Sequence, residues 1–577
     1  ANEVVKSVLG DICQELAQHI RKHHSDTIKQ YQALDSKTDL TKPHEWYPRA
    51  RLDLRKIIFH AGPTNSGKTY QALERLKKAN RGLYLGPLRL LAAEIYETLT
   101  SAGIYTNLFT GQEKREIPFA THSAATVEMA PTDEDFDVVV IDEIQMIREQ
   151  YRGGAWTKAL MGLRCKEIHV CGGLEAQSIV QQIADACGDE LETITYERFG
   201  PLRVEEKSLA PTPKALGSYK SVQPGDCVVA FSRNDIFAIK REIEQGTDYK
   251  CCVIYGSLPP ETRTDQARRF NDPDSGYDIL VASDAIGMGL NLNIRRIIFN
   301  SMYKFGGERI QLLDHSSVKQ IAGRAGRRNS QFPDGLVTCR DPEDMDHLRK
   351  CMSTEIAPIR KAGLLPTAEH VELFNEALRA HELTDDYDNL HKILVQFNEM
   401  ATLQGDFFLC RQTPMQIVAK MLNDVDLPLS DKYTLCMAPV STKDSRAMTT
   451  LKQYALKRSQ EQVAGAPRAM PKPAKTFDDL SHLCSIHNQI ELFLWLQHKF
   501  PGSNVMEEHS ALALKEKTIS LINSGLAESE RLALSHCYVK RDASIRNEWK
   551  ANQDSKKKSK LDELDDDYLP NSEVDDV

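Results

Sequence analysis

The sequence predicts an α/β fold made of two successive domains, with helical segments at both ends. Two series of short apolar runs alternate with helical stretches, one over residues 51–200 and the other over residues 201–345. This alternation is typical of parallel sheets with helices on both faces. Beyond residue 346 the strand pattern fades and long helical stretches replace it. We therefore expect an N-terminal helical segment, two α/β domains and a mainly helical C-terminal region.

Residues 1–50 are expected to form the N-terminal helical segment. The segment has helical spacing and ends near Pro43, and one apolar stripe in it consists of Val4, Val5, Val8, Leu9, Ile12 and Leu16. The chain starts at Ala1 without the apolar run of a signal peptide. Because Met is missing there, we expect that the chain has been trimmed and that a targeting segment is not visible.

The first α/β domain is expected over residues 51–200. Its strands are predicted to be buried because each is a short, nearly continuous apolar run. The runs are Ile57-Ile58-Phe59, Leu83-Tyr84-Leu85, Val138-Val139-Val140-Ile141 and Ile168-His169-Val170-Cys171.

The second α/β domain is expected over residues 201–345. Its strands are predicted at residues 227–231, 251–255 and 279–282, and it has no phosphate-binding loop of its own. Two domains that share one nucleotide loop predict a site that is completed across a cleft.

Residues 346–545 are expected to form the helical C-terminal domain. Long helical stretches run over residues 370–383 and 480–500, and Pro467, Pro471 and Pro473 mark a loop between them. Residues 546–577 change from basic to acidic, and we expect this tail to be disordered. The tail could dock a basic partner or only keep the chain soluble.

Composition argues against a membrane protein and leaves a nucleic-acid partner open. No apolar run approaches the ~18 residues that span a bilayer. The net charge is −9, but residues 561–577 alone carry −8, so the rest of the chain is nearly neutral and can hold a basic channel. The thirteen cysteines form no C-x-x-C pair and no zinc spacing with histidine, which fits a reducing compartment.

A phosphate-binding loop follows the first predicted strand. Its pattern is G-x-x-x-x-G-K-[ST], and a helical pattern comes directly after it. Backbone N–H groups of such a loop surround the β-phosphate, the Lys reaches the β- and γ-phosphates, and the Thr hydroxyl binds magnesium. We therefore predict that ATP and Mg²⁺ are cofactors. The residues are Gly62, Pro63, Thr64, Asn65, Ser66, Gly67, Lys68 and Thr69.

A carboxylate pair ends the strand at residues 138–141. Asp142 is placed to bind magnesium and Glu143 to orient or deprotonate the attacking water, because ligands meet at the carboxyl edge of a parallel sheet. Taken alone, the pair could equally be two acids that end a strand. The phosphate-binding loop makes the catalytic interpretation the better one.

Two arginines near the end of the second domain are predicted to complete the site. Arg324 and Arg327 are three residues apart, so we expect them on one helical face, reaching the γ-phosphate from across the cleft. A solvated basic helix face is the alternative. A glycine-rich loop after the strand at residues 279–282 contains Gly287 and Gly289, which could touch both nucleotide and nucleic-acid backbone.

The ordered motifs resemble those of a known family. GPTNSGKT, GPLRLLA, TVEMA, DEIQ, GGLEA, FSRND, SDAIGMGLNL and QIAGRAGRR are similar to the motif series of superfamily 2 helicases of the DExH type, over about half of the chain. The resemblance implies two RecA-like domains over residues 51–345. Gln145 in DEIQ and the stretch IAPIRKAGLLPT at residues 356–367 resemble the ATP-dependent RNA helicases of the mitochondrial degradosome.

This resemblance implies roles for further residues. Gln320 would join Lys68, Asp142, Glu143 and the two arginines as a catalytic residue. Contacts to the nucleic-acid backbone, with little base preference, would come from Pro87, Arg89, Thr110, Gly111 and Thr126 in the first domain and Ser232, Arg233 and Ser283 in the second.

Two departures from the family pattern limit what the resemblance implies. Gly172-Gly173 replaces the family's Ser-Ala-Thr run, which puts the coupling role of that segment in doubt. No aromatic-plus-Gln element is evident upstream of Gly62, so we expect loose selectivity for the base of ATP.

A hairpin is expected within residues 294–313. It would include Arg295-Arg296-Ile297-Ile298-Phe299 and a turn at Phe305-Gly306-Gly307. It could act as a strand-splitting wedge or be a plain hairpin.

The expected function is an ATP-dependent RNA helicase that moves 3′ to 5′, with DNA and RNA–DNA hybrids as further substrates, in mitochondrial RNA degradation and surveillance. The resemblance implies a mitochondrial matrix location, with a nuclear one also considered. It also implies a 3′ to 5′ exoribonuclease such as polynucleotide phosphorylase as a partner, and a homodimer is among the oligomeric states left open. The main alternative is an ATPase that remodels ribonucleoprotein without separating strands. A nucleotide-gated scaffold is disfavoured because Glu143 and both arginines are present.

Overall fold

The structure is a computed structural model, and it describes residues 25–111, 113–212, 218–306, 309–327, 330–383, 386–462, 465–500 and 505–528. The apolar stripe expected at residues 4–16 and the tail at residues 546–577 lie outside these ranges. The N-terminal segment contains α2 (Ser25–Thr38), followed by two short 3₁₀ helices, Pro43–Trp46 and Pro48–Arg51.

The first α/β domain is built on an eight-stranded sheet with the order β4-β3-β5-β2-β6-β7-β1-β8. All neighbouring strands are parallel except β3 and β4. The strands are β1 (Lys56–Ala61), β2 (Gly82–Gly86), β3 (Thr106–Phe109), β4 (Lys114–Arg115), β5 (His122–Thr126), β6 (Asp135–Ile141), β7 (Arg164–Gly172) and β8 (Glu190–Thr195). The helices are α3 (Lys68–Leu76), α4 (Arg89–Ser101), α5 (Gly153–Gly162) and α6 (Gln177–Cys187). Val138 to Ile141 are fully buried, as a central parallel strand requires.

The second α/β domain has a six-stranded, fully parallel sheet with the order β11-β12-β10-β13-β16-β9. Its strands are β9 (Leu202–Val204), β10 (Asp226–Val229), β11 (Cys251–Ile254), β12 (Ile279–Ala282), β13 (Arg296–Phe299) and β16 (Gly335–Cys339). Its helices are α7 (Arg233–Gly246), α8 (Pro260–Asn271), α9 (His315–Ala322) and α10 (Met345–Ser353). The predicted strands of both domains are therefore confirmed.

The expected hairpin is shorter than predicted. Residues 296–299 are not part of it, because Ile297, Ile298 and Phe299 are fully buried as β13 in the centre of the sheet. Arg296 is held at the start of β13 by Asp226, at 2.6 Å. The hairpin consists of β14 (Tyr303–Phe305) and β15 (Ile310–Leu312), which pair antiparallel.

The described part of the C-terminal region is mainly helical, as predicted, and contains a small parallel sheet. That sheet pairs β17 (Ala362–Leu364) with β18 (Phe407–Leu409). The helices are α11 (Ala368–Ala380), α12 (Leu390–Met400), α13 (Thr413–Met421), α14 (Leu429–Cys436), α15 (Ser445–Ser459), α16 (Phe477–Lys499) and α17 (Val505–Ala527).

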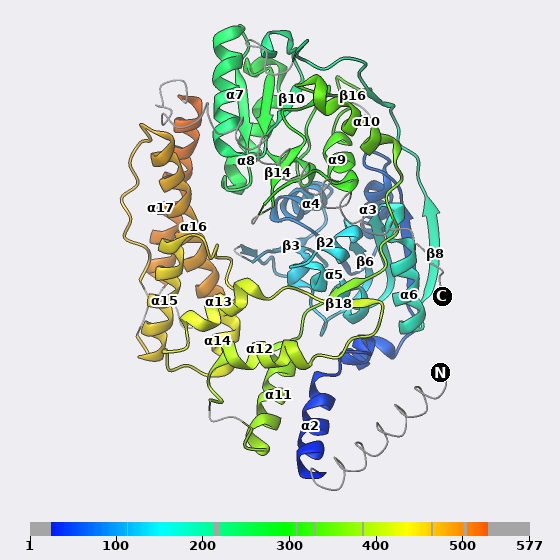
Figure 1. Cartoon of the computed structure of the whole chain (residues 1–577), viewed down its shortest axis with the longest axis vertical. Coiled ribbons are helices and arrows are strands. Elements are labelled where there is room, and N and C mark those ends of the chain that lie inside the picture. Colours follow the sequence, from blue (N-terminus) through cyan, green and yellow to red (C-terminus); the bar gives the residue numbers. More distant parts are fainter. Residues whose placement is uncertain are drawn as a thin grey trace, which may run out of the picture.

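Figure 1 shows the second domain at one end of the molecule, α2 and α11 at the other, and the first domain between them. The helices α15, α16 and α17 stand together along one side. One apolar core runs from the sheet of the first domain into the C-terminal helices and includes Ile141, Trp156, Phe374 and Leu492. The C-terminal helices are thus part of the body that carries the first domain.

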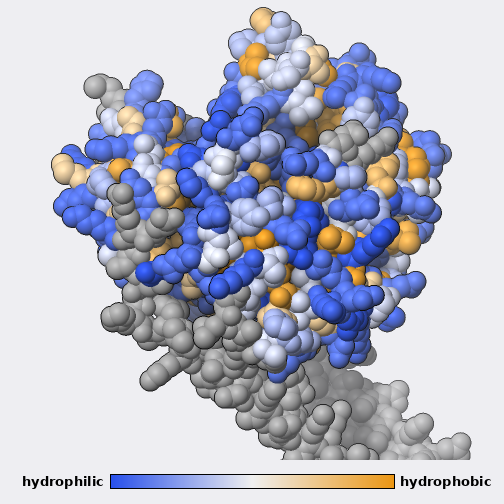
Figure 2. Space-filling view, turned by 90° about the horizontal axis from the view of Figure 1, so that it is seen from above, coloured by the Kyte–Doolittle hydropathy of each residue, from blue (hydrophilic) through white to orange (hydrophobic). Residues whose placement is uncertain are grey.

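The outer surface shows no dominant apolar patch in the view of Figure 2, where hydrophilic residues prevail and hydrophobic ones are scattered. Among the described residues, no helix combines the length and the apolar character that crossing a bilayer would need.

Candidate active site

The phosphate-binding loop lies between β1 and α3, as its sequence predicts. Gly67 has a φ of +81°, which favours glycine, and it is the residue just before α3. A Cβ on Gly62 would come within 2.7 Å of the Tyr196 carbonyl, so this position has no room for a side chain. Lys68 is buried at the start of α3, and its Nζ donates to the Pro63 carbonyl at 2.9 Å. The loop therefore forms a close-fitting cradle at a helix N-terminus.

The residues of this loop fit a bound phosphate and magnesium. Among the described residues, the Ser66 hydroxyl is a buried group without a hydrogen-bond partner, and it faces the cradle that a phosphate would fill. Thr69 Oγ1 donates to Asp142 Oδ1 at 3.2 Å, which brings together the two hard oxygen ligands that magnesium prefers. A magnesium ion held there would neutralise phosphate charge.

Asp142 is fixed by its surroundings. Its Oδ2 accepts from the Tyr84 hydroxyl at 3.1 Å, and its carbonyl accepts from Trp156 Nε1 at 3.0 Å. Burial raises the pKa of Asp142 above its usual range, Glu143 raises it further, and Lys68 lowers it. A buried carboxylate with this environment is a favourable place for a cation.

Glu143 is oriented by Gln145, the residue that makes this motif DEIQ. Glu143 has a φ of +51° and is half-buried, and Gln145 Nε2 donates to its carboxylate. Gln145 Oε1 in turn accepts from the Gly173 N–H at 3.3 Å. The Gly172 carbonyl accepts from the Gly62 N–H at 2.9 Å. The Gly172-Gly173 segment therefore joins the phosphate-binding loop to the predicted water-orienting carboxylate.

The second domain meets the phosphate-binding loop directly. Thr64 Oγ1 donates to the Gly323 carbonyl at 3.2 Å, and Asn65 Nδ2 donates to the Gly326 carbonyl at 3.0 Å. Arg198, in the segment between β8 and β9, donates to the carbonyls of Thr64 at 3.0 Å and Gly323 at 2.9 Å. One guanidinium thus binds both sides of the cleft.

Arg324 and Arg327 both line the cleft, but not from a helical face. The helix α9 ends at Ala322, and Gly326 turns the chain with a φ of +70°, so the expectation of a shared helical face was wrong. Arg324 donates to the Gly287 carbonyl at 2.9 and 2.6 Å, and Arg327 donates to Asn291 Oδ1. Burial lowers the pKa of Arg324, whereas Glu143 across the cleft raises it.

Gln320 and the glycine-rich loop lie beside these arginines. Gln320 is on α9, and a Cβ on Gly287 would meet its side chain at 3.8 Å. Gly289, with a φ of +80°, lines the cleft. Gly287 instead uses its carbonyl to accept the hydrogen bond from the Arg324 side chain. The segment predicted to be a loop begins with a 3₁₀ turn, Asp284–Gly287.

The cleft has a volume of about 890 Å³ and is lined by both domains. Tyr196, Arg198 and Phe199 are functional candidates that the sequence did not reveal. The Phe199 ring packs on Gly67, because a Cβ on Gly67 would lie only 2.8 Å from the ring. The Phe199 side chain is half exposed, on the side of the cleft. An aromatic face at this place suits a nucleotide base. The signal in the sequence is the aromatic and basic run at residues 196–199, in the segment that joins the two domains.

Three of the predicted backbone-contact residues touch α16. Arg89 Nη1 donates to Glu491 Oε2 at 2.5 Å, and Arg233 Nη1 donates to Ser481 Oγ at 3.1 Å. A Cβ on Gly111 would lie 3.7 Å from the Trp495 ring.

The other predicted contacts have local partners. The Pro87 carbonyl accepts from Arg152 at 2.6 Å, Thr110 Oγ1 accepts from the Glu113 N–H at 3.0 Å, and Thr126 is buried at the end of β5. Ser232 and Ser283 each cap a helix N-terminus.

Two RecA-like domains that share one nucleotide site across a cleft define the core of a superfamily 2 helicase. Residues 43–196 match the model of the DEXQ-box helicase domain of Suv3, and residues 212–329 match the helicase conserved C-terminal domain. Residues 417–459 match Suv3 C-terminal domain 1, and residues 480–528 match the C-terminal domain of the ATP-dependent RNA helicase SUV3. The chain belongs to the Suv3 family of DExH-type helicases.

Relatives in plants cover most of the chain. The mitochondrial DExH-box ATP-dependent RNA helicase DExH18 of Arabidopsis thaliana is 48% identical over 82% of this chain and 60% of its own length. The mitochondrial ATP-dependent RNA helicase SUV3L of Oryza sativa subsp. japonica is 44% identical over 88% of this chain and 68% of its own. The mitochondrial DExH-box ATP-dependent RNA helicase DExH16 of A. thaliana is 42% identical over 86% of this chain and 85% of its own length. The chain thus spans about two thirds of the length of the first two. Among solved structures, the Escherichia coli DEAH/RHA helicase HrpB aligns over 80% of this chain and 60% of its own, with a TM-score of 0.46 and 14% identity.

Proposed function

We propose that this protein hydrolyses ATP in the cleft and uses that reaction to move 3′ to 5′ along a single RNA strand and unwind RNA duplexes. The observation that carries the proposal is the site itself, in which one cleft collects the phosphate-binding loop, Asp142 and Glu143 from the first domain and Arg324 and Arg327 from the second. A nucleotide held by both domains changes their relative position when it is hydrolysed, and this converts chemistry into movement.

The proposed roles follow from the contacts around the cleft. Lys68 and the backbone N–H groups of the loop would bind the phosphates, with Thr69 and Asp142 as the ligands of magnesium. Glu143, held by Gln145, would orient the attacking water, and the two arginines would stabilise charge on the γ-phosphoryl group. Gln320 would act from α9, beside Gly287.

RNA is proposed as the main substrate because the relatives are named ATP-dependent RNA helicases. The strand would cross both domains along Pro87, Arg89, Gly111 and Arg233, with contacts mainly to phosphate and sugar. Phosphate groups are common to RNA and DNA, so DNA and RNA–DNA hybrids are proposed as further substrates. Phe199 and Tyr196 offer aromatic surface for the nucleotide base without base-specific hydrogen bonds, which fits loose nucleotide selectivity.

The hairpin β14–β15 is proposed as the wedge. Phe305 at its tip is 60% exposed, which suits contact with a base pair at the duplex junction. Lys304 pairs with Asp284 at 2.6 Å, and the 3₁₀ turn that starts at Asp284 ends at Gly287, the acceptor of Arg324. If Phe305→Ala unwinds as many base pairs per ATP as the wild type, the hairpin is not a wedge.

The decisive experiment is strand displacement with matched RNA duplexes that carry a 3′ tail, a 5′ tail or no tail. We expect release of the labelled strand only from the 3′-tailed duplex, only with ATP, and not with Glu143→Gln. ATP hydrolysis without strand release would instead support a ribonucleoprotein-remodelling ATPase. Release from the 5′-tailed duplex would contradict the proposed polarity.

A mitochondrial location is proposed from the names of the relatives, which do not extend to the nucleus. A role in RNA degradation with a 3′ to 5′ exoribonuclease, such as polynucleotide phosphorylase, and a homodimeric state are further proposals. Copurification with such a nuclease from mitochondria, and the mass of the protein in solution, test them.

A further inference from the structure

The helix α16 bridges the two α/β domains. Its N-terminal half packs Leu480, Leu483 and Cys484 into the core of the second domain. Its C-terminal half packs Leu492, Trp495 and Leu496 into the core that contains the first domain. The helix has 23 residues and is therefore about 35 Å long. Its middle lies where the two domains meet.

A charged group, which we call the crossing cluster, surrounds this midpoint and consists of Arg89, Glu261, His487, Glu491 and Lys515. These residues come from α4 of the first domain, α8 of the second, α16 and α17. Arg89 binds Glu491 at 2.5 Å. Lys515 Nζ lies 2.7 Å from Glu491 and 2.8 Å from Glu261. Four helices, from the two α/β domains and the C-terminal region, therefore meet in one ion-pair network.

Two buried nitrogen atoms at the crossing cluster have no hydrogen-bond partner among the described residues. In the part of the chain that the structure describes, His487 Nε2 has no hydrogen-bond partner although its side chain is only 2% exposed, and it lies 3.9 Å from Glu491. The Nε of Arg263, which is on α8 like Glu261, is likewise buried without a hydrogen-bond partner. Burial and the charge of Arg89 lower the pKa of Arg263 to about 10, which reflects crowded positive charge. The unpartnered Arg263 N–H, and three cations (Arg89, Arg263 and Lys515) against two carboxylates (Glu261 and Glu491), fit an anionic ligand.

A metal ion does not fit the same place. Glu261, His487 and Glu491 offer ligand atoms within 4.8 Å of one another. However, the Lys515 ammonium already lies between the two carboxylates, and Arg89 holds one of them. A divalent cation would have to displace both positive groups.

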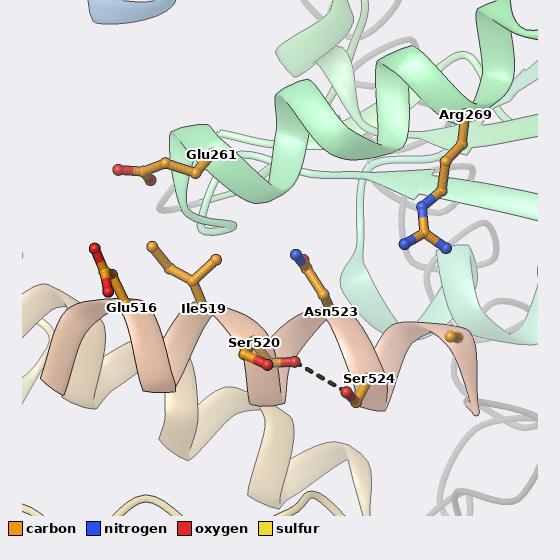
Figure 3. Close-up of a pocket in the computed structure, with 8 residues that line it drawn as sticks. Glu261, Arg269, Glu516, Ile519, Ser520, Asn523 and Ser524 are labelled. Atoms are coloured by element: carbon orange, nitrogen blue, oxygen red, sulfur yellow. Dashed lines mark hydrogen bonds between the residues drawn. The ribbon is translucent and has the colours of Figure 1, made fainter. Parts of the chain in front are cut away.

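The crossing cluster lies on the proposed strand track and opens to solvent. Arg233, Arg89 and Gly111 contact Ser481, Glu491 and Trp495, respectively, so the track follows α16 from one domain to the other. Glu261 is 44% exposed and Arg89 is 30% exposed. In Figure 3, Glu261 lies at one end of a groove of about 530 Å³ between α8 and α17, with Arg269 at the other end.

We propose that the crossing cluster binds one phosphodiester group of the nucleic-acid strand, and that Glu491 takes the place of this phosphate when no strand is bound. The phosphate would receive the Arg89 hydrogen bond in place of Glu491, with Arg263 and His487 as additional donors. Glu491 keeps its partner Lys515, so the exchange leaves no unpaired buried charge. Strand binding then breaks the ion pair between α16 and the first domain, which frees the two domains to move. This inference rests on the proposed function.

The test is the affinity of the full chain for a fluorescent single-stranded oligouridylate, measured without nucleotide. Glu491→Gln should bind about tenfold more tightly than the wild type, the size of one typical coupling contact. Glu376→Gln is the matched control, because it removes the same charge from an exposed position on α11, away from the crossing cluster, and should change affinity less than twofold. Arg89→Gln should bind about tenfold more weakly, with a salt dependence reduced by about one phosphate contact. The double variant should bind no better than Arg89→Gln.

The outcomes separate this inference from the proposed function. If Arg89→Gln binds more weakly but Glu491→Gln binds like the wild type, Glu491 does not compete with phosphate and the inference is wrong. If Arg89→Gln also binds like the wild type, the proposed track itself is wrong. Should Glu491→Gln not fold, His487→Leu gives a second test, because loss of its donor should weaken binding of the oligouridylate severalfold. Unchanged binding by folded His487→Leu would overturn the proposed phosphate site.

Discussion

Arg198 offers the sharpest prediction about how the two domains cooperate. Its guanidinium makes hydrogen bonds to the carbonyls of five residues, three of which belong to the turn that carries Arg324. Each of the three bonds to that turn contributes about 1 kcal/mol net. Because Gln could keep one of them, Arg198→Gln should make the free energy of domain closure less favourable by about 2 kcal/mol. This corresponds to about 30-fold in an equilibrium constant. The acceptors are Thr64, Gly200, Gly323, Ala325 and Gly326.

The assay is RNA-stimulated ATP turnover as a function of ATP concentration. We expect kcat/KM to fall about 30-fold for Arg198→Gln, because the closed cleft is the form that hydrolyses ATP. Arg203→Gln is the control, since Arg203 is exposed on β9, close in sequence and equal in charge. A folded Arg198→Gln variant with kcat/KM within threefold of the wild type would show that Arg198 does not hold the cleft closed.

Three further predictions concern residues around the cleft. Phe199→Ala should raise the KM for ATP about tenfold through loss of stacking on the base, whereas the control Phe119→Ala, at a 94% exposed position, should leave the KM unchanged. If both variants have the same KM for ATP, Phe199 does not stack on the base. Gln145→Leu should lower ATP turnover about tenfold with nucleotide binding retained in a fluorescence titration, and normal turnover would show that Glu143 needs no such support. Burial and the nearby His169 lower the pKa of His60 from 6.5 to about 4. Between these pH values the unfolded chain binds a proton at His60 and the folded chain does not, so the free energy of unfolding falls as the pH falls from 6.5 toward 4. Urea unfolding should therefore show a smaller loss of stability over this interval for His60→Gln than for the wild type, and equal losses would exclude His60 as the cause.

Local signals in the sequence were sufficient for the strands and the phosphate-binding loop. The run at residues 138–141 is apolar throughout, and only a strand covered on both faces accommodates it. Gly62, Gly67 and Lys68 have fixed spacing because the loop closes on itself within eight residues. Their geometry therefore depends on few distant contacts.

Distant contacts decide the features that the sequence did not reveal. The spacing of Arg324 and Arg327 is compatible with a helix, but the chain turns at Gly326 and packs against Gly335. A Cβ on Gly326 would lie 2.4 Å from the backbone nitrogen of Gly335. Arg296 reads as a surface residue, yet Asp226, seventy positions earlier, allows it to start a buried strand.

Residues that act between elements carry no periodic pattern at all. Arg198 and Phe199 lie in an irregular segment, and their role follows only from the approach of the two domains. Glu491 reads as one polar residue in a long helix, and only the fold places it against Arg89, 402 positions away.

We propose that ATP bound by the first domain is hydrolysed with help from arginines of the second while a strand lies across both. The most direct measurement is RNA-stimulated ATP turnover by the double variant Arg324→Gln, Arg327→Gln, with nucleotide binding measured in parallel. We expect retained binding and a loss of turnover of about a thousandfold or more, the usual contribution of such arginines. RNA-stimulated turnover within tenfold of the wild type would contradict it.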